Sequence, residues 1–444
     1  MITAISWPTA WGPPLPGKAV SPQSRDGNRV AMSLLGVGNE RRSGVMAARG
    51  LPGLDWLNFF VANFQTGFGP FISVYLTNVG WTQGAIGAAL STGTIASMVS
   101  QVPAGALVDA MRSKRMAAAA AIAAIGASAL AIALWPNFLA ITAAEALHSF
   151  ASAVLGPAIA AITLLLVDAS ALGERLGRNA RYAAIGNAMA AGLMGACASY
   201  LGDRTVFLFA AALAVPALAA LETLRKTDRA PVRLSRTASP PVQAPRADPS
   251  WRFLTDRRLV VFAACAALFH LANAAMLPVA AAAVTKRAGS QAGLVIAACI
   301  VGPQLITALL SPWAGRAAQA WGRRPVLLLG FSSLPLRGIL LACVADPCLI
   351  IAIQLFDGFS AAAFGVLFPL IVADVARETG HYTTSLGLVG LAIGFGATVS
   401  TTLAGLVADH LGVSIALLSL AAVGICAAVL VWTLMPETKV VAEE

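Results

Sequence analysis

The chain has 444 residues, of which 58% are hydrophobic and only 11% are charged, and its mean hydropathy is +0.77. A soluble globular domain carries about 25% charged residues, so this composition excludes a water-soluble protein and predicts that most of the surface faces lipid. The formal net charge of +10 could indicate a nucleic-acid binder, but the basic residues stand in short loops between apolar runs, so we expect no nucleic acid.

The sequence carries no signature of an enzyme. We find no nucleotide-binding glycine loop, no metal-ligand cluster and no nucleophile elbow. The six cysteines lie in or beside apolar runs, and we interpret them as small packing residues rather than as a disulfide framework or a metal site. We therefore expect no enzymatic activity, no cofactor and no metal.

Residues 1–50 precede the first apolar run and contain five prolines and six lysines or arginines. They lack the continuous apolar core of a secretory signal, so we interpret them as a disordered, basic N-terminal tail. Met32 and Met46 are alternative starts, and a start at either would remove most of this tail from the native protein.

From Leu51 onward the chain holds twelve apolar segments, each long enough to cross a membrane as a helix of ~20 residues. The predicted spans are 54–78, 83–108, 116–135, 138–167, 181–201, 205–224, 258–284, 291–317, 325–345, 348–375, 383–408 and 412–435. The stretch 225–257 is rich in proline and arginine and cannot insert into a membrane. We therefore expect an N-terminal six-helix bundle over 51–224, a cytoplasmic linker over 225–257, a C-terminal six-helix bundle over 258–436 and a tail over 437–444.

Lysine and arginine are distributed unevenly between the two sides of these predicted bundles. With the N-terminus inside, the inner segments carry 26 of these residues, the outer loops carry 3, and Arg337 lies within a span. An excess of basic residues marks the cytoplasmic side of a membrane protein. The sequence therefore predicts a multi-pass protein of a bacterial inner (plasma) membrane with both termini in the cytoplasm.

A short basic turn occurs twice, 210 positions apart, each time at the inner end of an apolar run. In both copies a glycine is followed four positions later by an acid or an amide, and then by a basic cluster. The first copy holds Gly105, Asp109, Arg112, Lys114 and Arg115, and the second holds Gly315, Gln319, Gly322, Arg323 and Arg324. A turn repeated at equivalent places in two halves indicates a duplicated membrane protein.

Nearly the same offset connects other positions of the two halves. The matched pairs are Asn63 with Asn273 (offset 210), His148 with Asp357 (209), Gly186 with Gly387 (201) and Gly195 with Gly396 (201). An ordered series of this kind predicts two bundles related by an axis along the membrane normal. The expected fold is an all-α membrane protein with 12 transmembrane helices in two pseudo-symmetric six-helix bundles.

On these residues the chain resembles the major facilitator superfamily over roughly 51–436. The stretch from Gly105 to Arg115 is similar to the family's signature between helices 2 and 3, although Arg112 stands where the family has a glycine. The spaced glycines of helix 5 resemble those of its drug–proton antiporters, whereas Glu145 replaces the arginine that many of these carry in helix 4. The resemblance implies alternating access, in which two bundles rock about a central cavity lined mainly by helices 1, 4, 7 and 10.

The resemblance also implies a cytoplasmic gate at the two basic turns, in which Asp109 engages basic residues of the turn and the end of helix 11. A carboxylate that is paired in one state and released in the other forms a bistable latch. The alternative is that the basic residues only fix the topology and bind lipid headgroups. The gate candidates are Gly105, Asp109, Arg112, Lys114, Arg115, Gly315, Arg323 and Arg324.

Ionisable residues within the spans need an explanation, because a charge at membrane depth is costly. Glu145 and His148 lie on one face of helix 4, Asp357 lies in helix 10, and His270 lies near the middle of helix 7. Our hypothesis is that Glu145, His148 and Asp357 form a titratable cluster that exchanges protons as a solute moves. The alternatives are a static polar network between helices 4 and 10, with Arg337 as a partner of Asp357, and side chains exposed at an interface.

Other residues of the predicted cavity helices are candidates for solute contact or for bending. Asn63, Asn273 and Gln65 are the candidate cavity residues, although an asparagine in such a helix can also simply bond to a neighbouring backbone group. Pro70 and Pro278 interrupt helices 1 and 7 and allow them to bend. We expect the same packing or bending role for Gly186, Gly195, Gly387 and Gly396. His270 faces either the cavity or the packing surface of helix 7.

These features predict a secondary transporter of a small organic solute. Few charged recognition groups lie in the central spans, so we expect proton-coupled efflux of amphipathic or drug-like compounds. We expect the protein to function as a monomer. Its expected partners are the solute, protons and the lipid bilayer. A metabolite importer or uniporter of the same fold is the alternative. An alternative of another class is a membrane sensor that does not transport, or a membrane-embedded enzyme.

Overall fold

The computed structural model describes residues 51–66, 68, 70–229, 255–280, 292–377 and 379–439. Within these residues the chain forms thirteen helices and no strand. The N-terminal half contains α2 (Pro52–Thr66), α3 (Pro70–Asn78), α4 (Gln83–Ala110), α5 (Lys114–Leu134), α6 (Phe138–Leu166), α7 (Ala169–Leu201) and α8 (Arg204–Arg229). The C-terminal half contains α9 (Arg257–Asn273), α11 (Ala292–Trp321), α12 (Arg323–Cys343), α13 (Pro347–Ala376), α14 (Tyr382–Leu411) and α15 (Val413–Leu434). The predicted N-terminal tail, most of the linker and the last residues of the C-terminal tail lie outside the described residues.

Twelve membrane crossings account for these helices, as the sequence predicts. Ten of the described helices are individually long and apolar enough to cross a membrane. The two remaining crossings are α2 with α3, which are interrupted, and α7, whose first half carries Glu174, Arg175, Arg178 and Arg181. Helix α8 continues to Arg229 and therefore extends into the range predicted for the linker.

The first and seventh crossings are broken where the sequence predicts a break, each near a proline. Pro70 is the first residue of α3, a position at which its missing N–H costs nothing. In the seventh crossing, α9 ends at Asn273, and the helical turn resumes over 276–280. Pro278 has no N–H to donate to the carbonyl of Ala274, and its ring crowds that carbonyl. At the same break the N–H of Ala275 donates to the Ser400 hydroxyl of α14 at 3.1 Å.

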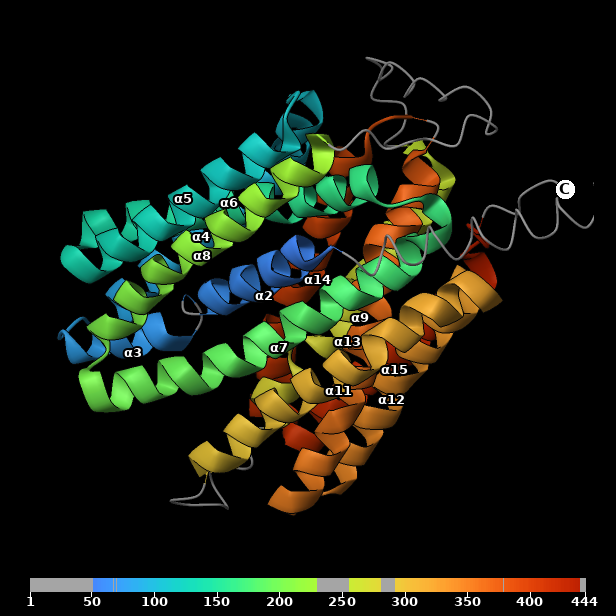
Figure 1. Cartoon of the computed structure of the whole chain (residues 1–444). Helices are drawn as coiled ribbons and strands as arrows, with labels where there is room; N and C mark the ends of the chain where they lie inside the picture. The colour runs from blue at the N-terminus through green and yellow to red at the C-terminus, as the bar shows by residue number, and fades with distance from the viewer. Residues whose placement is uncertain are drawn as a thin grey trace, which may run out of the picture.

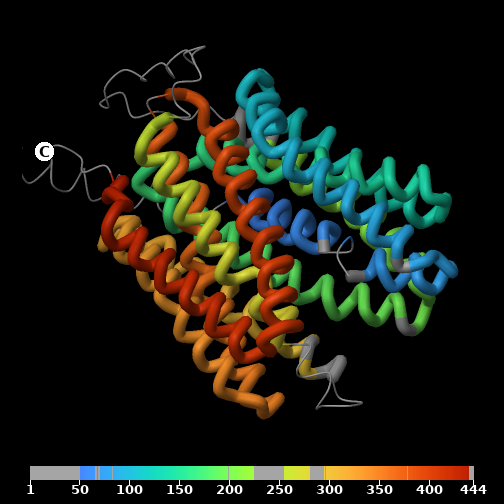
Figure 2. Tube along the Cα trace, turned by 180° about the vertical axis from the view of Figure 1, so that it is seen from behind, coloured from blue at the N-terminus to red at the C-terminus, as the bar shows by residue number. Residues whose placement is uncertain are grey.

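The helices form two bundles that meet at one end and diverge toward the other (Figure 1, and from behind Figure 2). Packing inside each half joins α4 and α5 to α6 and α2 to α7 and α8, and correspondingly α11 and α12 to α13 and α9 to α14 and α15. Two helix pairs make the main contacts between the halves, α4 with α14 and α7 with α11, and we call them the crossing pairs. We call the end at which the bundles meet the basic end, because it carries the two basic turns at 111–115 and 322–324.

Close backbone contact along both crossing pairs depends on glycine. A Cβ on Gly105 of α4 would overlap the backbone of Thr383 on α14, and a Cβ on Gly387 of α14 would overlap the carbonyl of Gln101 on α4. The second pair repeats this arrangement, because Cβ atoms on Gly177 and Gly315 would overlap backbone atoms of the opposite helix. The seam between the bundles is therefore closed at the basic end by backbone-to-backbone packing.

Candidate functional site

Asp109 spans the seam at the basic end and caps the first turn of α14. Its carboxylate accepts hydrogen bonds from the backbone N–H groups of Thr383 (3.1 Å) and Thr384 (2.8 Å) and from the Thr384 hydroxyl (2.7 Å). The Thr383 hydroxyl donates in return to the carbonyl of Gly105 at 2.7 Å. Because the first N–H groups of a helix lack intrahelical partners and attract negative charge, Asp109 holds α4 against α14 while this end is closed.

Lys114 binds backbone carbonyls at the end of α4 rather than the carboxylate of Asp109. Its ammonium group donates to the carbonyls of Val108 (2.6 Å), Asp109 (2.9 Å) and Met111 (3.0 Å). These carbonyls belong to the last turn of α4 or follow it, where helical partners are missing. Asp109 thus contacts α14, which is the eleventh crossing, as expected. Lys114 instead binds backbone carbonyls of its own turn. Arg112 and Arg115 line, with Lys114, a cavity of 290 Å³ beside α6 and α8.

Gln319 occupies in the second half the place of Asp109 and contacts the other crossing pair. Its side-chain amide donates to the carbonyl of Ala169 at the start of α7 (3.2 Å) and its oxygen accepts from Arg323 (3.2 Å). Arg323 also donates to the carbonyl of Ala318 (2.9 Å), which stands 210 positions after Val108. The two turns therefore share one device, a basic side chain that caps the preceding helix, but only the first carries an acid at the seam.

An ionic cluster below the second turn was not found by sequence analysis. Arg323 forms a buried ion pair with Asp374 of α13 (2.8 Å). Glu437 accepts hydrogen bonds from the backbone N–H groups of Arg323 (2.8 Å) and Arg324 (3.1 Å) and so caps α12. Gly322 turns the chain there with φ of +103°, a conformation that favours glycine. In the first turn Arg112 stands at the matched position, and no described residue other than glycine has a positive φ.

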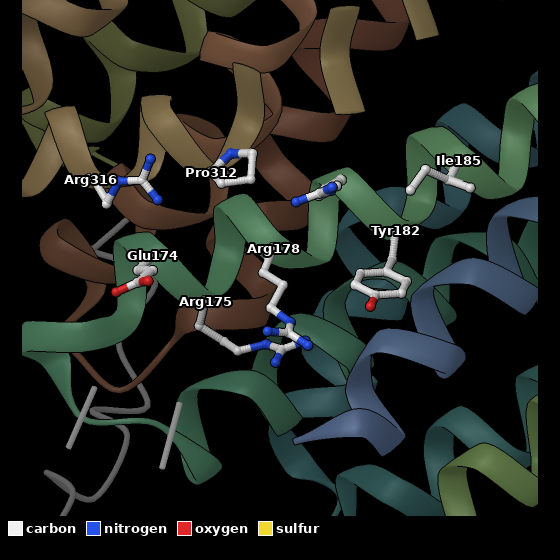
Figure 3. A pocket seen from close by; sticks show the side chains of 8 residues that line it. Glu174, Arg175, Arg178, Tyr182, Ile185, Pro312 and Arg316 are labelled. Carbon is white, nitrogen blue, oxygen red and sulfur yellow. The ribbon is translucent and has the colours of Figure 1, made fainter. Parts of the chain in front are cut away.

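Asp55 and two arginines form a second network that the sequence did not reveal. Asp55 is 2% exposed and pairs with Arg175 and, in a bidentate manner (2.6 to 3.0 Å), with Arg178. The guanidinium groups of both arginines converge below α7 in Figure 3. Arg175 also donates to Asn179, which donates to Thr163 of α6. Asp55 lies in the first turn of α2, and its pairs with the two arginines join α2 to α7.

Glu145 and His148 lie inside the N-terminal bundle, where α6 approaches α4 and the break of the first crossing. Glu145 is 6% exposed, and its Oε2 would be 2.7 Å from a Cβ on Gly93, so the absence of a side chain at Gly93 makes room for the carboxyl group. The ring of His148 stacks on Phe68 with centroids 3.7 Å apart. Glu145 Oε1 and His148 Nδ1 are buried without a hydrogen-bond partner among the described residues.

Asp357 belongs to a separate group in the C-terminal bundle. It pairs with Arg337 of α12, whose guanidinium group also donates to the Asn273 side chain at the end of α9 (2.8 Å). The Arg337 side chain is 1% exposed, and that of Asp357 is 31% exposed. Within the described part of the chain, no hydrogen bond or ion pair joins Asp357 to Glu145 or His148. The structure therefore places the three predicted titratable residues in two groups, one in each bundle.

Gln354 mirrors Glu145 and was missed, although the offset of 209 that matches His148 with Asp357 also matches Glu145 with Gln354. Gln354 is 1% exposed, and its Oε1 is a further buried atom without a partner among the described residues. Asn63 resembles it, because its side chain is 2% exposed and its Oδ1 is likewise unpaired. Buried polar groups are normally satisfied, so these atoms are exceptions among the described residues.

The remaining candidates differ in what surrounds them. Gln65 donates to Ser152 of α6 at 3.4 Å and so bridges the first and fourth crossings. His270 bonds through Nδ1 to the carbonyl of Ala266 on its own helix, α9, at 3.0 Å, and its ring packs against Phe269 and Phe364. These contacts favour the alternative in which His270 faces the packing surface of the seventh crossing. Gly186 and Gly396 lie against backbone carbonyls of α2 and α9, whereas a Cβ added at Gly195 would have no heavy atom within 4 Å.

Open space lies beside two glycines at matched positions of α6 and α13. Gly156 and Gly365 are 209 positions apart, both are exposed, and neither has a heavy atom within 4 Å of a Cβ position. Gly156 shares a helical face with Glu145 and Ser152, and Gly365 shares one with Gln354. The fourth and tenth crossings thus present bare backbone on the same helical faces as the unpaired polar atoms, about three turns farther along each helix.

Comparisons with known proteins agree with this architecture. The family model described as Major Facilitator Superfamily matches residues 54–302 and 262–444. Two curated relatives from Mycobacterium tuberculosis, the uncharacterized MFS-type transporters MT2531 (strain CDC 1551 / Oshkosh) and Rv2456c (strain ATCC 25618 / H37Rv), are each 38% identical over 390 residues, covering 87% of this chain and 93% of the relative.

Solved structures share the fold at low sequence identity. A crystal structure of the MFS transporter FucP in the outward conformation matches with a TM-score of 0.66 and 13% identity over 86% of this chain and 97% of FucP. The proton:xylose symporter XylE, bound to 6-bromo-6-deoxy-D-glucose, matches with a TM-score of 0.70 and 14% identity over 90% of this chain and 97% of XylE. At these identities the likeness concerns the fold alone.

Proposed function

The chain belongs to the major facilitator superfamily, and we propose that it is a secondary active transporter that exports small amphipathic or drug-like solutes in exchange for protons. Membership of this family makes it a multi-pass membrane protein that carries a small solute, and not an enzyme. The coupling ion, the direction and the solute class are the proposal. The observation that carries the proposal is the buried and unpaired carboxyl group of Glu145 on the inner face of α6.

We place the basic end in the cytoplasm of a bacterial inner membrane, with both termini on that side. The excess of lysine and arginine in the segments at this end supports the orientation. In this orientation the closed seam faces inward and the diverging ends of the bundles open outward. Because one chain contributes both bundles and both basic turns, we propose that the monomer is the transporting unit.

Glu145 and His148 are proposed as the proton site. An unpaired carboxyl group inside a bundle has no nearby cation to hold it in the charged form, so a proton or a cationic group of the solute must neutralise it. The stacking of His148 on Phe68 places a second titratable group at the break of the first crossing. Rocking of the bundles moves this break and would therefore change the access of both groups to water.

The solute is proposed to be neutral or cationic. Arg337 is a cation buried in the C-terminal bundle, but Asp357 already compensates its charge, so it offers little attraction to an acidic solute. The unpaired oxygens of Glu145, Gln354 and Asn63 are acceptors, which favours a solute that donates hydrogen bonds or carries positive charge. The bare backbone at Gly156 and Gly365 gives such a solute room rather than specific charged contacts.

The test is flux in reconstituted vesicles with an imposed pH gradient and a panel of cationic, neutral and acidic solutes. We expect a cationic or neutral amphipathic solute to move against the proton gradient, and Glu145→Gln to lower proton-coupled flux by at least about ten-fold, since a glutamine cannot carry the proton. The matched control is Glu222→Gln, which removes the same charge from an exposed position of α8.

The outcomes separate the alternatives. Unchanged coupled flux in Glu145→Gln vesicles would reject this residue as the proton site. Solute entering together with protons would replace export by import, and flux without proton movement would indicate a uniporter. Absence of flux for every member of a broad panel, with correctly inserted protein, would favour a sensor.

A further inference from the structure

A basic cavity of 350 Å³ lies across the seam between α7 and α11 and plays no part in the proposed solute path. Four arginines line it, namely Arg175, Arg178 and Arg181 from α7 and Arg316 from α11. Figure 3 shows Arg316 and Pro312 on α11 at one side of α7, whereas Arg175 and Arg178 start from α7 and bring their guanidinium groups together below that helix. The two bundles therefore both contribute cations to one cavity at the basic end.

The positive charge of this cavity exceeds the negative charge around it. Arg175 and Arg178 share the single carboxylate of Asp55, and Glu174 adds one more carboxylate to the wall. Arg181 and Arg316 are exposed, and their side chains bond to no other residue in the described part of the chain. Four guanidinium groups thus stand against two carboxylates, which leaves an excess of about two positive charges across the seam.

An anion that accepts several hydrogen bonds is the natural occupant of such a cavity. Guanidinium groups bind phosphate oxygens in a bidentate geometry, and basic pockets between transmembrane helices on the cytoplasmic side suit phosphate headgroups. We propose that this cavity binds a phosphate monoester or diester, supplied either by the headgroup of an anionic phospholipid or by a soluble phosphate compound.

The edge of the cavity favours the lipid as the source. Tyr182 and Ile185 line it on the α7 side, and the half-exposed Trp56 of α2 lies against Tyr182 with ring centroids 6.5 Å apart. Tryptophan and tyrosine prefer the level of the headgroups, where one end of the ring is wet and the other apolar. A phosphate at the arginines would leave a glycerol backbone and its acyl chains beside these rings.

Binding at this place is coupled to the state of the seam. Gly173 and Gly177 of α7 lie in backbone contact with Gly315 and Ser311 of α11, directly beside the arginines. If the seam opened, Arg316 would move away from Arg181, and the anion would lose part of its partners. An anion that binds the closed form better must stabilise that form to the same extent.

The double variant Arg181→Gln/Arg316→Gln tests the site in the full-length protein. Purified protein in mixed micelles is given phosphatidylglycerol or phosphatidylcholine, and separately inorganic phosphate or glycerol 3-phosphate, and bound molecules are counted by native mass spectrometry. We expect the apparent affinity for phosphatidylglycerol to fall roughly ten-fold or more in the double variant, because two charge-assisted contacts are lost. Phosphatidylcholine, whose headgroup is neutral overall, should be retained less well by the wild-type protein.

The control is Arg257→Gln/Arg258→Gln, which removes the same charge at the start of α9, at the same end of the molecule but outside the cavity. Retention of phosphatidylglycerol by the control and loss by the double variant would support the headgroup. Loss of inorganic phosphate or glycerol 3-phosphate binding alone would assign the site to a soluble anion. Equal retention of all four probes by the wild type and the double variant would overturn the proposal. The single variant Arg316→Gln, whose side chain is exposed, serves if the double variant does not fold.

Discussion

Asp109 and Gln319 occupy equivalent places in the two halves, yet they close the seam by different chemistry. The carboxylate of Asp109 binds the N-terminal N–H groups of α14, whereas the amide of Gln319 donates to one carbonyl at the start of α7. A negative charge at a helix N-terminus is stabilised by about 0.3–1 kcal/mol through the helix dipole, and by up to about 2 kcal/mol when partly buried. The seam therefore has one charged latch and one neutral latch.

Replacing Asp109 by asparagine should weaken the charged latch while leaving its shape nearly intact. The loss of about 1 kcal/mol predicts an approximately five-fold shift of the equilibrium toward the state with an open basic end. Spin labels at the exposed Met116 of α5 and Val260 of α9, in a background without native cysteines, measure the distance between the bundles at this end.

Asp346→Asn is the matched control for this latch. Asp346 caps α13 by accepting a hydrogen bond from the N–H of Leu349 at 3.0 Å, but donor and acceptor belong to one bundle. The control should leave the label distances unchanged. An identical distance distribution for Asp109→Asn and the wild type would mean that the cap does not decide whether the seam is closed.

Sequence patterns located most residues of the site but few of their partners. The offsets of 210 and 209 matched the two turns and the polar residues of the fourth and tenth crossings, because a duplicated fold keeps equivalent positions. The pair of Asp357 with Arg337, one of the alternatives that the sequence offered, is present, but the sequence did not indicate that Asp55 pairs with Arg175 and Arg178, because these contacts join different helices. Such pairings depend on the rotation of each helix about its axis, which hydrophobic runs without a polar face do not specify.

At the level of helices, the seam is built from close contacts that a single methyl group would disturb. A Cβ on Gly177 would overlap the backbone carbonyl of Ser311, so that α7 and α11 could approach as closely only after a shift of backbone. Overpacking of this kind typically costs about 1–3 kcal/mol. The glycines therefore set how tightly the basic end can close.

Gly177→Ala should consequently shift the protein toward the open basic end by roughly five-fold or more. Gly192→Ala lies in the same helix and has no heavy atom within 4 Å of its Cβ position, so it isolates the effect of the seam from that of helix propensity. Broadened or lengthened distances between the Met116 and Val260 labels are expected for Gly177→Ala alone. Equal distances in both alanine variants would show that the seam tolerates the extra atom.

The sequence predicted which segments form helices, whereas the places where helices break depend on individual side chains. Long apolar runs predicted the twelve crossings, and Pro70 and Pro278 predicted the two breaks. The second break lies where the ring of Pro278 crowds the carbonyl of Ala274, four positions earlier. The Ser400 hydroxyl of α14 accepts a hydrogen bond from the N–H of Ala275 at this break. The first half of α7 is less apolar than the other crossings, because its arginines pair with Asp55 and its glycines pack against α11 at the seam. The sequence therefore indicates this crossing less clearly.

For the whole molecule, two bundles that are joined at one end and diverge at the other are the arrangement expected for one state of the proposed alternating-access cycle. The close contacts Gly105 with Thr383 and Gly177 with Ser311 lie at the basic end. Toward the middle of the crossings, α4 and α14 are less tightly packed. A Cβ on Gly394 of α14 would lie 3.5 Å from the Met98 side chain of α4, which is an ordinary contact distance. The state described here therefore needs a partner state in which the basic end opens and the opposite ends approach each other.

Two pairs of labels test whether the ends move reciprocally. The pair Met116 and Val260 reports on the basic end, and the pair Leu139 of α6 and Ile415 of α15 reports on the opposite end, where both side chains are exposed. Because each bundle moves as a packed unit, conditions that lengthen the first distance should shorten the second. The transported solute and a change of pH should each shift both distributions in opposite directions. Distances that lengthened together at both ends would mean that the bundles separate rather than rock, and the alternating-access mechanism would not describe this protein.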